Sequence, residues 1–115
     1  MHRFGQETVF ATYRVRAGNE KAFLGLVARH WPTLFRLGFT NGEPALVFQG
    51  EDGTGGPLVF EVFTWKDRAS VAHAHEHPEA AAIWEAMEPL VEARPGREKW
   101  EFPHVHPVRM PHAKP

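Results

Sequence analysis

One segment of this chain, Leu58–Trp65 (LVFEVFTW), is apolar on both faces of the strand that it predicts. The first strand-like segment, Thr8–Arg16 (TVFATYRVR), also carries large apolar side chains on both faces. A sheet with one face in water shows an alternation of apolar and polar residues instead. Both faces of this sheet therefore need a cover, and any fold for the chain has to supply one on each side.

Turn residues and apolar spacing predict two further strands. Ala45–Gln49 is the second strand, and a glycine-rich loop, GEDGTGGP, joins it to Leu58–Trp65 as a hairpin. The last strand is predicted over Lys99–His106. Pro103 lies inside that strand and lacks an N–H, which requires an edge position or a bulge.

Two helical regions lie between these strands, each with an apolar stripe at three-and-four spacing. Asn19 is a plausible N-cap for the first helix, and Pro32 predicts that this helix kinks or restarts near Trp31. Asp67 can cap a short helix over Arg68–His75, and a second segment starts at Pro78. The two stripes are Phe23, Leu26, Val27, His30 and Leu34, then Ala80, Ile83, Trp84, Met87 and Val91.

The order β-α-β-β-α-β predicts an α+β fold class with an antiparallel sheet and the ferredoxin-like plan. A chain of 115 residues predicts one domain over residues 8–106, with an N-terminal arm at 1–7. Residues 107–115 form a proline-rich tail that is either disordered or lies over a partner chain.

Two helices cover only one face of a four-stranded sheet. Three or four exposed aromatic side chains on the other face would present roughly 500–1,000 Å². A soluble monomer usually shows at most about 300–600 Å² in one patch. The sequence therefore predicts a homodimer joined through the sheet faces. The candidate side chains for that face are Phe10, Phe48, Phe63, Trp65 and Phe102.

Composition excludes several classes of protein. The absence of cysteine excludes disulfides, thiolate metal sites and a cysteine nucleophile. The net charge of −1 and the scattered Lys and Arg residues argue against nucleic acid as a partner. No apolar run approaches the ~18 residues of a membrane span, and the start lacks a signal-like apolar region. We expect a cytoplasmic protein with no membrane partner.

Three histidines at every second position, His73, His75 and His77, follow the apolar strand. His75 is on the apolar side of its helix, whereas His77 precedes Pro78 and lies in an elbow. Either His75 or His77 could remove a proton from a phenolic or enolic substrate near neutral pH. The alternative for each is a structural hydrogen bond or a helix cap, which is the more common role of such a histidine.

Glu61 shares a strand face with apolar residues, and a buried carboxylate is costly unless it is paired or protonated. A Glu–His pair would orient the imidazole as a general base. The alternative is a structural ion pair or a position at the sheet edge in water. Candidate partners of the carboxylate are Arg14, Arg16, His75 or a histidine of the last strand.

Trp65 and Trp84 could provide flat apolar walls for an aromatic ligand, with His104 beside them, although such aromatics also serve as core or dimer contacts. The histidines raise the question of a metal, but their spacing differs from that of ligand pairs on a helix. No glycine-rich loop opens a helix, which argues against nucleotide binding. We expect no metal and no cofactor.

The chain resembles the dimeric α+β-barrel superfamily, and within it the antibiotic-biosynthesis-monooxygenase-like branch, over about residues 8–106. The resemblance rests on VFATYRVRAGNEKAF, VFEVFTWKD and AHAHEHPEAAAIWEAM. It implies a ligand cavity between the sheet and the helices of each subunit, and oxygenation of quinol-like or anthrone-like rings without metal or flavin. In the haem-degrading branch a helix histidine binds iron, and the corresponding position here is Trp84, so haem degradation is not expected.

Three functional hypotheses follow. The first is a cofactor-independent monooxygenase acting on a small aromatic or enolic compound, with His75 or His77 as the base and Glu61 as its orienter. The second is a non-catalytic module that binds a small molecule or acts in a stress response through the same cavity. The third is a histidine metal site.

Overall fold

A computed structural model describes residues 7–111 of the 115-residue chain. These residues form five strands, three α-helices and one 3₁₀ turn. The predicted β-α-β-β-α-β order is confirmed, with the last strand divided into two short pieces. In chain order the elements are β1 (Thr8–Arg14), α1 (Glu20–Arg36), β2 (Leu46–Glu51), β3 (Pro57–Thr64), α2 (Arg68–Glu76), α3 (Pro78–Met87), η1 (Glu88–Leu90), β4 (Trp100–Glu101) and β5 (His104–Val105).

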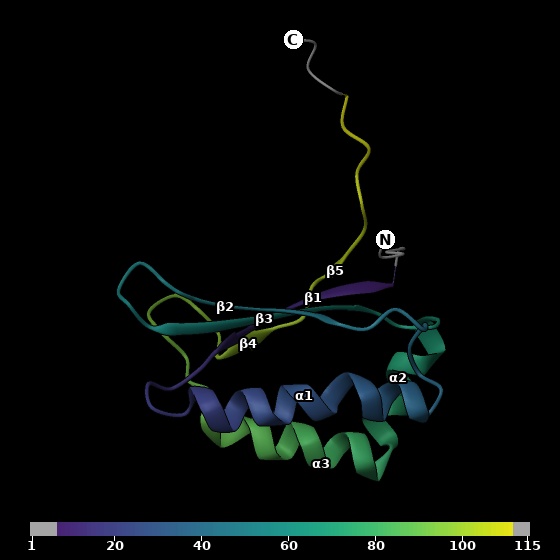
Figure 1. Ribbon diagram of the computed structural model, residues 1–115, viewed down its shortest axis with the longest axis horizontal. Helices are drawn as coiled ribbons and strands as arrows, with labels where there is room; N and C mark the ends of the chain where they lie inside the picture. The colour runs from purple at the N-terminus through teal and green to yellow at the C-terminus, as the bar shows by residue number, and fades with distance from the viewer. Residues whose placement is uncertain (1–6, 112–115) are drawn as a thin grey trace.

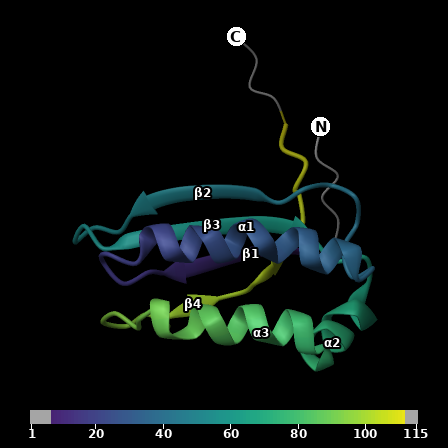
Figure 2. The same cartoon turned by 60° about the horizontal axis from the view of Figure 1, so that its bottom comes forward.

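The strands form one antiparallel sheet in the order β2-β3-β1-β4, and β5 also pairs with β1. The two central strands, β1 and β3, are the segments that are apolar on both faces. Figure 1 shows the helices on one side of this sheet, and Figure 2 shows α1 and α3 side by side across it. The ferredoxin-like fold class predicted from the sequence is confirmed.

Pro103 divides the last strand at the edge of the sheet, as predicted. β4 and β5 hold the same register on β1, because Thr12 faces Glu101 and Thr8 faces Val105. Between them the Phe10 N–H donates to the Pro103 carbonyl at 2.9 Å. Proline has no N–H to return this bond, so the ladder is interrupted without a shift in register.

Helix α1 runs without a break through Pro32, so the predicted restart near Trp31 is wrong. Ala28 and Pro32 are both exposed, and the carbonyl that loses its N–H partner at this turn can therefore bind water. The buried stripe keeps the helix on the sheet across the interruption. Asn19 holds the N-cap position, but its side chain makes no capping hydrogen bond.

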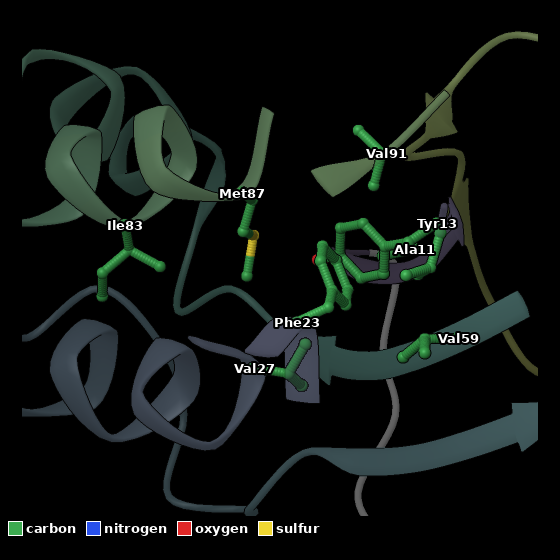
Figure 3. Packing of buried hydrophobic residues seen from close by; sticks show 9 residues of the cluster. Ala11, Tyr13, Phe23, Val27, Val59, Ile83, Met87 and Val91 are labelled. Carbon is green, nitrogen blue, oxygen red and sulfur yellow. The ribbon is translucent and has the colours of Figure 1, made fainter. Parts of the chain in front are cut away.

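The second helical region follows its predicted boundaries closely. The Asp67 carboxylate accepts the Ser70 N–H at 2.8 Å and caps α2. Pro78 starts α3, which changes into the 3₁₀ turn before Pro89. Both predicted stripes face the core, with Leu26 and Trp84 only partly buried. Figure 3 shows nine buried residues filling the space between helices and sheet: Ala11, Tyr13, Val15, Phe23, Val27, Val59, Ile83, Met87 and Val91.

The sheet face opposite the helices is less aromatic than predicted. Phe10 and Phe48 lie on it, 39 % and 52 % exposed, whereas Phe63, Trp65 and Phe102 lie on the helix side. Strand alternation is the reason, because Phe63 and Trp65 share the face of the buried Glu61. The apolar residues of β1, β2 and β3 that the register places on the opposite face, called the open sheet face below, are Phe10, Leu46, Phe48, Leu58, Phe60 and Val62.

The chain after β5 leaves the sheet on the side away from the helices (Figure 1), with Val108 and Met110 exposed. Residues 1–6 of the predicted arm and 112–115 of the predicted tail lie outside the described residues, so that division of the chain stays a prediction. Among residues 7–111, no helix has the length and apolar character that a membrane crossing requires. The cytoplasmic location stays a prediction.

Arg94 ties the β2–β3 hairpin to the end of the first strand. Its guanidinium donates to the Val15 carbonyl at 2.7 Å, to the Pro57 carbonyl at 3.0 Å and to Asp52 Oδ2 at 2.8 Å. A Cβ added at Gly56 would lie 2.6 Å from Arg94 Nη1. With Glu92 Oε2 at 3.3 Å from Nε, four separate acceptors hold this side chain, so it has little freedom to move aside.

Gly56→Ala should therefore lower the free energy of unfolding by about 1–3 kcal/mol in urea titrations. Gly53→Ala is the matched control in the same loop, because nothing lies within 4 Å of its added Cβ. That control should change stability by about 0.5 kcal/mol or less. Equal effects of the two substitutions would show that Arg94 does not crowd this turn.

Candidate functional site

A cavity of about 460 Å³ lies between the sheet and the helices, where the family resemblance places a ligand site. Strands β1 and β3 and the last strand line one side of it, and residues of all three helices line the other. The lining is mainly aromatic and contains no Lys, Arg, Asp or Glu. The lining residues are Val9, His30, Phe63, Trp65, Val71, His75, Trp84, Trp100, Phe102 and His104.

A second hollow, of about 620 Å³, is more open and lies near the end of α3. Four of its five charged side chains form ion pairs: Arg16 lies 3.5 Å from Glu92, and Lys99 lies 3.1 Å from Glu88. These pairs leave little charge to attract a ligand. The aromatic cavity is therefore the candidate site.

Four of the six residues singled out in the sequence line this cavity. Trp65 lies buried just after β3, and Trp84 comes from α3. His75 of α2 tilts over the Trp84 ring, with 4.8 Å between ring centroids. His104 of β5 reaches the cavity opposite Val9, and its Nδ1 lies 3.4 Å from Glu7 Oε2. The structure thus brings the predicted ligand-contact residues together.

His77 occupies the elbow between α2 and α3, as its place before Pro78 indicates. Its Nδ1 accepts the Glu79 N–H at 3.2 Å, so it caps α3. Its ring lies edge-on to Phe39, and it is not among the residues that line the cavity. The geometry matches the capping alternative, and its role as a base stays a prediction.

Glu61 is fully buried, with 0 % of its surface exposed. The Tyr13 hydroxyl donates to Oε1 at 2.7 Å, and His30 Nδ1 lies 2.9 Å from Oε1 and 3.0 Å from Oε2. The partners predicted from the sequence are wrong. Arg14, for example, follows Tyr13 on the other face of β1 and binds Glu101 instead.

His30 is a candidate site residue that the sequence pattern did not single out. It lies on the buried stripe of α1, is 2 % exposed, and was interpreted there as an ordinary core position. The Trp84 indole N–H donates to His30 Nε2 at 2.8 Å. An indole can only donate, so Nε2 carries a lone pair and Nδ1 carries the hydrogen that binds Glu61. The imidazole is therefore neutral in this arrangement.

Tyr13 completes the network from the sheet side. Burial raises the pKa of its phenol well above 10.0, and the negative charge of Glu61 and the hydrogen bond to it raise this pKa further. Tyr13 therefore keeps its proton at neutral pH and acts only as a donor to the carboxylate. Together Tyr13 and His30 give the buried carboxylate two donors, which offsets part of its desolvation.

The Glu61–His30 dyad and its donor Tyr13 are together called the buried dyad network below. A carboxylate that accepts from Nδ1 holds the imidazole in one tautomer and stabilises the imidazolium that forms when Nε2 takes a proton. Nε2 faces the aromatic cavity and is occupied by Trp84. The arrangement is that of a general base whose reactive lone pair is covered by an indole.

A histidine metal site finds no support in the described part of the chain. Among residues 7–111, no group of three or more His, Asp or Glu side chains is placed to hold a metal ion. The three alternating histidines diverge: His73 is exposed, His75 lines the cavity and His77 caps a helix.

Comparison of the sequence with family models and with curated proteins finds no match. Solved structures do match. The Nitrosomonas europaea protein named "Putative antibiotic biosynthesis monooxygenase" is 13 % identical, with a TM-score of 0.63 over 94 % of this chain and 96 % of that one. A Caulobacter crescentus protein of the same name is 14 % identical, with a TM-score of 0.61 over 92 % and 94 %.

A NIPSNAP family protein of unknown function from Agrobacterium tumefaciens is 18 % identical, with a TM-score of 0.64 over 96 % of this chain and 95 % of that one. At such identities the likeness shows the fold alone. The resemblance predicted from the sequence is confirmed at that level. This chain has the α+β fold of these solved structures, which are named as putative antibiotic biosynthesis monooxygenases and a NIPSNAP family protein.

Proposed function

We propose that the aromatic cavity binds a small aromatic or enolic compound, and that the protein oxygenates it without a cofactor. In this mechanism His30 Nε2 removes a proton from the substrate, and Glu61 holds the imidazole and stabilises its positive charge. The observation that carries the proposal is the buried Glu61–His30 pair, 2.9 Å apart, in which His30 lines an aromatic cavity and holds the Trp84 indole on Nε2.

The cavity itself supports a small-molecule site. Its volume of about 460 Å³ lies within the 300–1,000 Å³ usual for such sites, and its lining is apolar with few polar groups. Trp65 and Trp84 supply the flat surfaces, and His75 and His104 the polar contacts near them. The names of the neighbouring structures, two of which mention monooxygenases, point to the same chemistry.

The proposed reaction needs only substrate and dioxygen. Loss of a proton to His30 makes the ring system electron-rich enough to reduce O₂. For an anthrone, a CH₂ group becomes C=O: one oxygen atom enters the product and the other leaves as water with the two hydrogens. The substrate supplies all the electrons, which is why the proposal names no flavin and no metal.

Oxygen uptake with a panel of hydroquinones and anthrones tests this proposal. We expect His30→Ala to lower kcat/KM by about 100-fold or more, the usual contribution of a positioned base. His30→Gln serves as a second variant with a similar shape, in case the alanine variant folds poorly. His73→Ala is the control, because this histidine is exposed on α2 outside the cavity lining.

His75→Ala and His77→Ala in the same assay test the roles predicted for these residues from the sequence. If either is the base, its variant will lose as much activity as His30→Ala. No uptake with any compound of the panel, or full activity in both His30 variants, would contradict the proposed oxygenase.

A specific observation favours the non-catalytic alternative. The Trp84 indole already satisfies His30 Nε2, so the network is complete without a substrate. A binding protein would keep this bond or exchange it reversibly, and would take up no oxygen. Saturable binding of hydroquinones without oxygen uptake would support this second function.

We also propose that two copies of the chain form a homodimer through their open sheet faces. The uncovered face carries six apolar side chains, of which Phe48 is 52 % exposed and Phe10 39 %. The chain beyond β5 extends on this same side with Val108 and Met110 exposed (Figure 1), where it could pack on the second copy. Burial of such a face stabilises a dimer at roughly 25 cal/mol per Å² of apolar surface.

A further inference from the structure

The polar atom that the buried dyad network presents to the cavity is an acceptor. His30 Nε2 binds an indole N–H, which shows that the position is built to receive a hydrogen-bond donor. A ligand that takes the place of the indole must therefore offer an O–H or N–H group. An ether, carbonyl or carboxylate oxygen at the same place would face the lone pair and leave Nε2 without a partner, which costs free energy in a buried site.

The negative charge of Glu61, which binds the other nitrogen of His30, adds a preference for neutral ligands. Glu61 is 0 % exposed, and its two partners, a protonated phenol and a neutral imidazole, carry no positive charge to balance it. The cavity lining contains no Lys or Arg. The other titratable groups that face the cavity are His75, which is exposed, and His104, which lies near Glu7. A ligand that arrives as an anion meets a like charge in a poorly solvated site.

A neutral ligand with a donor avoids this repulsion. When its proton moves to Nε2, the imidazolium lies between the Glu61 carboxylate and the new ligand anion, so the two negative charges flank one positive charge. The net charge of the site does not change, because the proton moves only from ligand to histidine.

Trp84 is placed so that it can give up its bond. It packs at the margin of both hydrophobic clusters but is only partly buried, and the rings nearest to it are the exposed His75 at 4.8 Å and His30 at 5.9 Å between centroids. An indole N–H that swings toward solvent exchanges one hydrogen bond for another with water, at little cost. His30 has no such freedom, because it is 2 % exposed and held by Glu61.

We infer that a ligand displaces the Trp84 indole from His30 and that its own hydrogen-bond donor takes the place of the indole N–H. The cavity therefore binds neutral aromatic ligands with such a donor more tightly than anionic ligands of the same shape. The inference rests on the proposed location of the ligand site but not on any turnover. It assigns Trp84 a role in selectivity beyond that of an apolar wall.

Equilibrium binding by titration calorimetry, without oxygen, tests the inference with three probes of similar shape. 2-Naphthol is neutral and donates, 2-methoxynaphthalene is neutral and has no donor, and 2-naphthoate is an anion. We expect the wild-type protein to bind 2-naphthol about 5- to 10-fold more tightly than the methoxy compound, and 2-naphthoate most weakly.

Trp84→Phe keeps an aromatic ring but removes the competing N–H. This variant should bind 2-naphthol about 5- to 10-fold more tightly than the wild type, because the donor no longer has to displace the indole. Its affinity for 2-methoxynaphthalene should rise much less. Trp100→Phe is the matched control: this indole also lines the cavity but does not bind His30, so its replacement should affect the two neutral probes equally.

Several results would overturn the inference: equal wild-type affinity for the two neutral probes, binding of 2-naphthoate as tight as that of 2-naphthol, or no binding of any probe. An equal change for both neutral probes in Trp84→Phe would also overturn it. The expected affinities without oxygen uptake by any hydroquinone would leave this inference intact and contradict the oxygenase. Oxygen uptake that depends on His30, together with tight binding of 2-naphthoate, would support the oxygenase and contradict this inference.

Discussion

Glu61→Gln should lower the free energy of unfolding by about 2–4 kcal/mol, although glutamine has nearly the same shape as glutamate. The carboxylate accepts from both Tyr13 and His30. A glutamine puts an NH₂ group in place of one carboxylate oxygen: at Oε1 it removes the acceptor of the Tyr13 hydroxyl, and at Oε2 it places a second donor about 3.0 Å from His30 Nδ1–H. If His30 changes tautomer to compensate, its Nε2–H then faces the Trp84 N–H.

Urea titration at one fixed protein concentration measures this effect, since assembly would also contribute to stability. Glu85→Gln is the matched control, an exposed glutamate of α3 that should change stability by about 0.5 kcal/mol or less. Tyr13→Phe removes one donor from the same carboxylate, so its effect and that of Glu61→Gln should not add. A Glu61→Gln protein as stable as the wild type would contradict the buried dyad network.

The second large effect concerns assembly. We expect the wild-type protein to sediment as a dimer at micromolar concentration and Phe48→Glu to sediment as a monomer. Phe48 is 52 % exposed on the open sheet face. A two-fold interface would contain the new carboxylate twice, unpaired in an apolar contact, which costs several kcal/mol and weakens dimerisation by about 100-fold or more.

Phe35→Glu provides the control for this experiment. Phe35 is 48 % exposed, close to the value for Phe48, but it belongs to α1 on the helix side of the molecule. The same chemical change there should leave the dimer intact in sedimentation velocity. A monomeric wild type would contradict the proposed dimer. A dimer that is lost in Phe35→Glu but kept in Phe48→Glu would indicate an interface on the helix side of the molecule.

The local sequence pattern predicted most of the helices and strands, because the start and end of each element depend on residues close in sequence. The Asp67 cap, the start of α3 at Pro78 and the edge position of Pro103 each follow from one or two residues and their neighbours. Helix α1 does not restart at Pro32, because packing of its buried stripe on the sheet outweighs one missing hydrogen bond.

The candidate site was predicted in part for the same reason. Trp65, His75, Trp84 and His104 were chosen by periodicity, which tells which side of an element faces inward, and all four line the cavity. His77 was assigned two possible roles, and its local geometry is that of a helix cap.

By itself the sequence determined the order of the elements, the inward stripes of the helices and the apolar character of both faces of the central strands. It also indicated that a carboxylate at Glu61 would need a partner if its strand face were buried, and the structure shows that it is buried. Only the tertiary structure decided that this partner is His30. The two residues are 31 positions apart, and no local period relates a helix stripe to a strand face. They meet because the β1–β3 register and the docking of α1 on the sheet place them together, and these are long-range contacts set by the packing of the whole domain.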